Sequence, residues 1–258
     1  MSQKGHINES KKNVPLVVAI IVVILAGFFG AGRFIHVNIK WPKFVDPENM
    51  RLRDLDAGGA DTVWLQEDGE NVPYVVISSN YDGKVLLMRR EALPDEIPYR
   101  DENAFGSGGG YYPGSDVDEF LNGEFYDRLG QDVRSAIEDC TVVVASADTV
   151  SRGDSRRNTE EISRHVFLLS FTELNQFGSS MAAKEGKALK ALKIEEYLTY
   201  DYEWLRSAYL WDDVHAWAIA ADFCGEVAVS EPHRVRPVFA MSRDTAIVAD
   251  GEHRYILK

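Results

Sequence analysis

Short apolar runs alternate with polar turns along most of the chain, but one segment near its start is apolar throughout. Residues 14–32 hold no charged, amide or hydroxyl side chain, and basic residues stand on both sides, Lys12 before and Arg33 after. As a helix, this segment would span about 28 Å, close to the hydrocarbon thickness of a bilayer. The pattern predicts a transmembrane helix over residues 14–32, with residues 1–13 as a cytoplasmic tail.

A cleaved signal peptide is the alternative interpretation, because the small residues at 30–32 resemble a cleavage site. The apolar region of a signal peptide normally covers about 7–15 residues, so the length favours an uncleaved anchor. The rest of the chain would then lie outside the cytoplasm. Residues 33–61 are predicted to form a stalk, because Pro42, Pro47 and the pair at 58–59 interrupt their apolar pattern.

From residue 62 to residue 258 the pattern predicts one compact domain. Two β-rich runs, at 72–78 and 84–88, are separated by Asn-Tyr-Asp-Gly, a sequence typical of a hairpin turn. Ser115 and Asp118 have the spacing of a capping box, which predicts that a helix begins there.

The rest of this domain shows further short elements and no internal repeat. Together with the hairpin, their order predicts the α+β class rather than a parallel βαβ fold. The expected elements are a helix at 131–138, strands at 141–145 and 165–170, a helical turn at 171–177, a solvated helix at 184–193 and a β-meander at 203–248, with an exposed loop at 151–164.

Charge and cysteine content narrow the range of functions. The chain has 28 Lys and Arg against 41 Asp and Glu, a net charge of −13. This balance argues against nucleic acid as a partner, because phosphate contacts need clustered basic residues. With only Cys140 and Cys224, the chain can form neither a disulfide-dense scaffold nor a four-thiolate zinc site.

Six local strings of the domain occur together in one order. They are Lys84-Val-Leu-Leu-Met88, Leu121-Asn-Gly-Glu-Phe-Tyr126, Asp132-Val-Arg-Ser-Ala-Ile137, Val166-Phe-Leu-Leu-Ser170, Trp204-Leu-Arg-Ser207 and Val235-Arg-Pro-Val-Phe239. In this order they resemble a bacterial surface family known as domain of unknown function 6273. That family in turn looks related to the formylglycine-generating-enzyme-like branch of the C-type-lectin fold. The resemblance implies a C-type-lectin-like α+β domain exported by a Gram-positive bacterium, and it implies no established activity. Arg234 stands where the family usually has glycine.

The residues of these strings have a structural explanation. Leu121, Phe125 and Trp204 are expected to fill the core. If Arg206 and Arg236 are buried, each needs a carboxylate or carbonyl partner, because an unpaired buried charge is very costly. We therefore expect structural roles for Leu121, Phe125, Trp204, Arg206, Arg236 and Pro237.

The resemblance also raises an enzymatic alternative, since formylglycine-generating enzymes work through two cysteines that bind copper. Cys140 and Cys224 have apolar neighbours that favour burial, which raises the pKa of a thiol, so a disulfide or two buried thiols is the expected state. No zinc-protease, nucleophile-elbow or phosphate-loop motif is present. The sequence points to no catalytic residue and no metal ligand.

A set of aromatic and polar residues forms the candidate ligand surface. Trp211-Asp212-Asp213 and Glu231-Pro232-His233 come close to the calcium-dependent sugar motifs of C-type lectins, but their order is reversed and the asparagines are replaced. Calcium is therefore less favoured than no cofactor at all. Trp217 is expected in the core and Trp211 on the surface. The candidate ligand-binding residues are Tyr111, Tyr112, Trp211, Asp212, Asp213 and His233.

These features together predict a non-catalytic recognition or assembly module at the cell surface. It would be anchored in the cell membrane by residues 14–32, with its C-terminal domain outside, and would bind a glycan or a peptide. A structural or accessory subunit of an envelope complex is one alternative, and a divergent formylglycine-generating-type enzyme is the other.

Overall fold

The computed structural model describes residues 49–101, 109–152, 157–174 and 182–258. The predicted cytoplasmic tail, the transmembrane helix and residues 33–48 of the predicted stalk lie outside this part of the chain. No helix among the described residues is both long and apolar enough to cross a membrane. The membrane anchor stays a prediction from the sequence.

Strands dominate the described residues, of which they make up 42%, whereas helices make up 17%. The expectation of a C-type-lectin-like α+β domain behind a membrane helix is therefore wrong, and the domain is mostly β. Its helices are too short to form a layer, because the longest of those described, α2 (Asp116–Asn122), has seven residues. The others are α3 (Glu124–Arg128), α4 (Gln131–Ala136), α5 (Ala147–Arg152), α6 (Phe171–Leu174) and the 3-10 turns η2 (Leu52–Asp54) and η4 (Ile194–Glu196).

The strands of the described residues build three sheets. They are β1 (Thr62–Glu67), β2 (Glu70–Tyr81), β3 (Lys84–Arg89), β4 (Glu96–Pro98), β5 (Ile137–Glu138), β6 (Cys140–Ala145), β7 (Thr159–Arg164), β8 (Val166–Phe167), β9 (Glu203–Ala208), β10 (His215–Ala220), β11 (Phe223–Ala228), β12 (Pro232–Arg234), β13 (Val238–Ser242), β14 (Ile247–Gly251) and β15 (Arg254–Leu257). The first sheet has the order β14-β15-β1-β2-β3-β13-β5, with β8 paired to β13. The second has the order β11-β10-β9-β12-β4, and the third consists of β6 and β7.

The predicted hairpin is confirmed as β2 and β3, which pair from Tyr81 and Lys84 at the turn. The two turn residues, Asp82 and Gly83, have φ values of 48° and 82°. Two consecutive positive φ angles are the geometry of a type I′ turn, whose twist matches that of the flanking strands.

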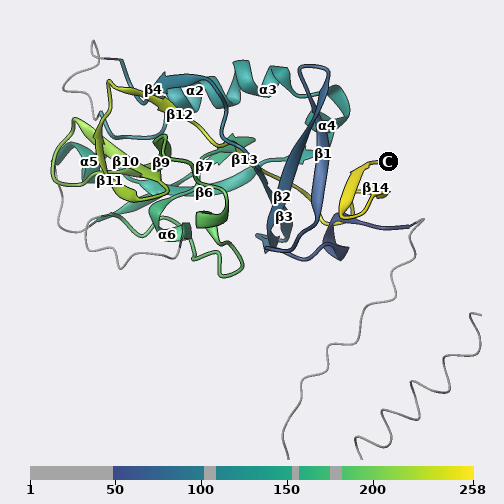
Figure 1. Ribbon diagram of the computed structural model, residues 1–258. Coiled ribbons are helices and arrows are strands. Elements are labelled where there is room, and N and C mark those ends of the chain that lie inside the picture. The colour runs from purple at the N-terminus through teal and green to yellow at the C-terminus, as the bar shows by residue number, and fades with distance from the viewer. Residues whose placement is uncertain (1–48, 102–108, 153–156, 175–181) are drawn as a thin grey trace, which may run out of the picture. The chain divides into compact units, whose positions relative to one another are not determined.

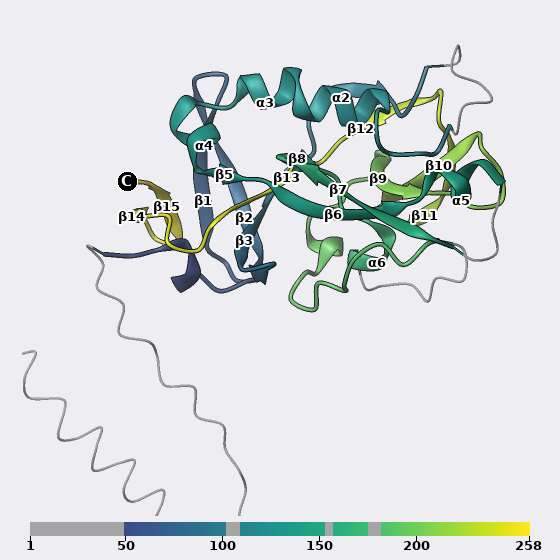
Figure 2. The ribbon, with the colours of Figure 1, turned by 180° about the vertical axis from the view of Figure 1, so that it is seen from behind.

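The predicted β-meander is confirmed only in its first part, where β9, β10 and β11 pair in sequence. The next strand, β12, lies in the same sheet on the other side of β9, and β13 then joins the first sheet beside β3. In Figure 1 and from behind in Figure 2, β6 and β7 run between strands β1–β3 and strands β9–β11, and α2 and α3 lie along one side of the domain.

Two segments differ from the expected structure. Residues 159–164, expected as part of an exposed loop, form β7 and pair with β6 along its whole length. Residues 184–193, expected as a solvated helix, follow an irregular path, because Glu185 is buried and Gly186 has a φ of 90°. A left-handed residue of this kind does not fit inside an α-helix.

The domain begins before the boundary predicted at residue 62. Leu52 and Leu55 lie in the hydrophobic core, and the backbone N–H of Leu52 donates to the carbonyl of Thr245 at 3.0 Å. The end of the predicted stalk is therefore part of the domain, because its two leucines pack inside it.

The core contains the residues of the six ordered sequence strings that were expected to be buried. Leu121, Phe125 and Trp204 are buried, and the indole N–H of Trp204 donates to the carbonyl of Ile97 at 2.8 Å. Ser115 caps α2 as predicted, because its hydroxyl accepts the N–H of Asp118 at 3.2 Å. These contacts join α2 and β9 to the same hydrophobic interior.

Candidate functional site

Arg206 lies at the centre of a network of polar groups inside the core. It is fully buried on β9, and its guanidinium makes two parallel hydrogen bonds to Glu173, at 2.6 and 3.0 Å. It also donates to the carbonyls of Val143 and Leu168, at 3.1 and 2.7 Å. A planar guanidinium paired in this way is a fixed structural group, as expected from the sequence.

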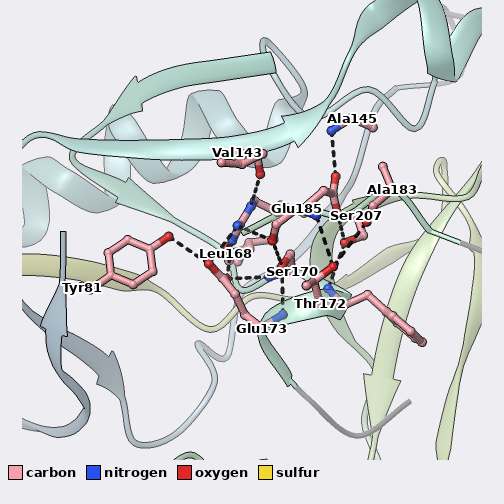
Figure 3. A network of polar contacts seen from close by, with 12 residues as sticks. Tyr81, Val143, Ala145, Leu168, Ser170, Thr172, Glu173, Ala183, Glu185 and Ser207 are labelled. Carbon is pink, nitrogen blue, oxygen red and sulfur yellow. Dashed lines mark hydrogen bonds and ion pairs between the residues drawn. The ribbon is translucent and has the colours of Figure 1, made fainter. Parts of the chain in front are cut away.

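A second carboxylate, Glu185, completes this network, whose arrangement Figure 3 shows. Glu185 accepts the N–H of Ala145 at 2.8 Å and the hydroxyl of Ser207. Burial raises the pKa of Glu185 to about 7. The neighbouring Gly186 permits this packing, because a Cβ there would lie 2.9 Å from the carboxylate of Glu173.

Arg236 makes a second buried ion pair, with Glu203. Two of its N–H groups reach the carboxylate, at 2.7 and 2.6 Å. The other donors reach the carbonyls of Arg89 at 3.2 Å, of Tyr197 at 2.8 Å and, more closely, of Arg90. Pro237, which follows it, is buried and accepts the N–H of Arg89 at 3.0 Å. Both residues therefore hold the fold together at this point.

The two cysteines lie on strands of different sheets and are not joined in a disulfide. Burial raises the pKa of the Cys140 thiol to about 11 and that of the Cys224 thiol to about 12. Both are therefore protonated at neutral pH, whereas the thiolate is the nucleophile and metal ligand.

Trp211 stands on the turn between β9 and β10, with 69% of its surface exposed. The turn is held by Asp212, whose carboxylate accepts the N–H groups of Val214 and His215 at 3.1 and 3.0 Å. The same carboxylate lies 2.9 Å from Nδ1 of His215. We call residues 209–214 the Trp211 turn. Asp212 fixes its backbone, and the indole ring projects from a rigid support.

The structure brings the segment that carries Tyr111 beside this turn. A Cβ on Gly109 would clash with the carbonyl of Asp213, and a Cβ on Gly110 would lie 2.6 Å from that of His215. The two glycines thus allow close backbone approach. Tyr111 itself donates its hydroxyl to Glu160 on β7 at 2.5 Å.

Two candidate residues lie elsewhere. Tyr112 is buried, with its ring centroid 6.5 Å from that of Tyr99. His233 lies on β12 and packs its ring against that of Trp204. The next residue of β12, Arg234, is the strand neighbour of Glu203 at the start of β9. The Trp211 turn follows the end of β9, so His233 does not join it. In the described part of the chain, no group of three or more potential metal ligands comes together.

A polar cleft that the sequence reasoning missed lies near the start of β9. It has a volume of about 330 Å³ and is lined by Arg90, Glu91, Ala92, Glu196, Tyr197, Thr199, Arg234 and Arg236. We call it the arginine cleft. Arg90 comes from a segment far from Arg234 and Arg236 in the sequence, so nothing in the sequence signals that they meet. The local sequence offers one feature here, the tyrosine-rich run at 197–202.

The fold and these sites define a mostly β domain that is braced by buried ion pairs. Comparison with protein families matches residues 82–243 to the domain of unknown function DUF6273, and the chain belongs to this family. No curated protein and no solved structure gives a match. The expected relation to formylglycine-generating enzymes and C-type lectins is therefore not shown.

Proposed function

We propose that this chain is a non-catalytic recognition or assembly module of the cell surface, which binds a glycan or a peptide through the Trp211 turn. The observation that carries the proposal is the exposed indole of Trp211 on a backbone that Asp212 already holds in place. A flat aromatic face stacks on sugar rings and packs on peptide side chains. Because the turn is already ordered, binding would cost little conformational entropy.

The state of the buried charges supports a role without catalysis. Arg206 and Arg236 are occupied by carboxylates and carbonyls inside the protein. The thiols of Cys140 and Cys224 are protonated. Within the described residues these groups are therefore not arranged as an activated nucleophile with a base.

The cellular setting of the proposal rests on the sequence. A transmembrane helix at 14–32 would anchor the chain in the cell membrane with the C-terminal domain outside. The whole chain has a net charge of −13, and its acidic excess lies after residue 32. This charge would hold the domain away from an anionic membrane surface, so that its ligand surface stays accessible. Kinship with formylglycine-generating enzymes remains a prediction from the motifs, and the proposed function does not depend on it.

The test is a glycan and peptide array probed with the full chain in detergent, with and without calcium. We expect at least one glycan or peptide on the array whose binding disappears in Trp211→Ala and is the same in both calcium conditions. Tyr200→Ala is the matched control, because Tyr200 is equally accessible, at 80% exposure, and lies beyond the other end of β9. An array without any binding, or equal binding by Trp211→Ala, would contradict the proposal.

A further inference from the structure

The arginine cleft has walls that are fixed before any ligand arrives. Arg236 lies at its base and uses its N–H groups on Glu203 and on carbonyls of both walls, those of Arg90 and Tyr197. Residues 90–92 and 196–199 therefore keep their separation. A cleft held in this way loses little entropy on binding, and about 330 Å³ lies at the lower end of ligand-pocket volumes.

Two arginines of this cleft have guanidinium N–H donors that are not used in hydrogen bonds within the described residues. The guanidinium of Arg90 is exposed and has no hydrogen-bond or ion-pair partner among the described residues. Arg234 pairs with Asp201 through one terminal nitrogen at 2.9 Å, its side chain is 32% exposed, and its other terminal nitrogen makes no hydrogen bond among the described residues. The accessible donors of both guanidinium groups can therefore hydrogen-bond to an anionic ligand in the cleft.

The charges of the residues that line the arginine cleft indicate which kind of anion it can bind. Guanidinium groups bind carboxylates in a planar, two-bond geometry. Glu91 and Glu196 stand in the same lining, so a ligand with many negative charges would be repelled. The net charge of −13 acts in the same direction. The cleft therefore favours a ligand with a single carboxylate.

The other lining groups favour hydroxyl-rich ligands over peptides. Carboxylate oxygens can accept hydrogen bonds from hydroxyls: Glu91 offers both of its oxygens, and Glu196 offers the oxygen that does not pair with Lys193. Only Ala92 and the ring of Tyr197 supply apolar surface, which suits one face of a sugar ring but leaves no pocket for an apolar side chain.

We propose that the arginine cleft binds the carboxylate of an acidic sugar, of the uronic acid class, between Arg90 and Arg234. This site is separate from the Trp211 turn, because the two lie at opposite ends of β9. The acidic sugar binds here whether or not the turn has a ligand of its own.

Calorimetric or NMR titration of the full chain with methyl glucuronide tests the proposal. We expect saturable binding, at least about tenfold weaker binding of the uncharged methyl glucoside and of glucuronamide, and weakening by added salt. Arg90→Gln should lower the affinity for methyl glucuronide at least about tenfold. Arg243→Gln, which removes the same charge from another exposed position, should not.

Three results would overturn the proposal: no saturable binding of methyl glucuronide, equal binding of methyl glucoside, or unchanged affinity in Arg90→Gln. A short peptide with a free C-terminal carboxylate that displaces the sugar at lower concentration would overturn it in favour of a peptide site. Trp211→Ala should retain the affinity for methyl glucuronide. If Trp211→Ala lost the affinity for methyl glucuronide, the cleft would not be a separate site. If no array ligand bound but methyl glucuronide still did, only the role of the Trp211 turn would be refuted.

Discussion

Glu173 is held by Arg206 through two parallel hydrogen bonds of 2.6 and 3.0 Å, and both side chains are completely shielded from solvent. The pair joins α6 to β9 across 33 residues of sequence. Tyr81, at the end of β2, donates its hydroxyl to the same carboxylate at 2.8 Å, which ties the first sheet to this centre. The pair is therefore a junction between parts of the domain rather than a local contact.

Removing the cation from this junction should be strongly destabilising. We expect Arg206→Met to lower the free energy of unfolding by about 3–5 kcal/mol, because Glu173 is left buried without its partner. Chemical denaturation measures the change. Arg134→Met is the control, since it breaks an exposed pair with Asp127 that should contribute less than about 1 kcal/mol. Similar losses in both variants would refute the structural role assigned to Arg206.

Glu185 should make stability depend on pH. Burial raises its pKa from 4.5 to about 7, so the folded state binds this proton more tightly than the unfolded state. The stability that the folded state gains from binding this proton is fully present below about pH 4.5 and is lost as the pH rises through about 7. The free energy of unfolding should fall by roughly 3 kcal/mol over this range. In Glu185→Gln this part of the pH dependence should vanish. Denaturation of both proteins at several pH values gives the difference, and parallel curves would contradict the prediction.

Gly186 should tolerate alanine poorly, and Gly69 offers a matched comparison. Both have positive φ angles, 90° and 80°, so alanine costs backbone strain at either position. Only at Gly186 would the new Cβ also meet the carboxylate of Glu173, whereas nothing lies within 4 Å of a Cβ at Gly69. We expect Gly186→Ala to lose at least about 1 kcal/mol more than Gly69→Ala. Equal melting temperatures would show that the carboxylate moves aside freely.

Two tryptophans should differ strongly in how much stability is lost when each is truncated to alanine. Trp204→Ala should cost about 3–5 kcal/mol, because it empties a core site and leaves the carbonyl of Ile97 without its donor. Trp211→Ala should change stability by less than about 0.5 kcal/mol. Thermal melting compares the two. A large loss in Trp211→Ala would mean that its ring packs on the protein in solution.

The thiols should be slow to react in the folded protein. Because the pKa values of Cys140 and Cys224 are raised to about 11 and about 12, very little thiolate exists at pH 8. Alkylation of the native chain at pH 8 should be much slower than alkylation in urea. Equally fast labelling of either cysteine would revive the enzymatic alternative.

Local patterns predicted those features of the domain that local chemistry controls. The turn at Asp82-Gly83 and the cap at Ser115 depend on residues within a few positions, and both were predictable. The helix predicted at residues 184–193 was wrong for the opposite reason. Their alanines and lysines favour a helix, but Glu185 is buried in the core, where it accepts hydrogen bonds from Ala145 and Ser207. Tertiary contacts outweighed the helix propensity.

The candidate site was predictable only in part. Trp211 was assigned to the surface because two aspartates follow it, and the structure places it there. His233 was grouped with it through a motif resemblance, although the two lie on separate elements. The arginine cleft escaped notice because Arg90 and Arg234 are 144 positions apart, so that only the fold brings them together.

In the ion pairs of Arg206 and Arg236, the carboxylate precedes its arginine along the chain. Glu173 and Glu203 are each 33 residues ahead of the cation that neutralises them, Arg206 and Arg236. A nascent chain therefore contains each acid before its base has been synthesised. Each pair can form only after its arginine has been synthesised, so a chain that ends before Arg206 or Arg236 would have to bury the acid without its cation.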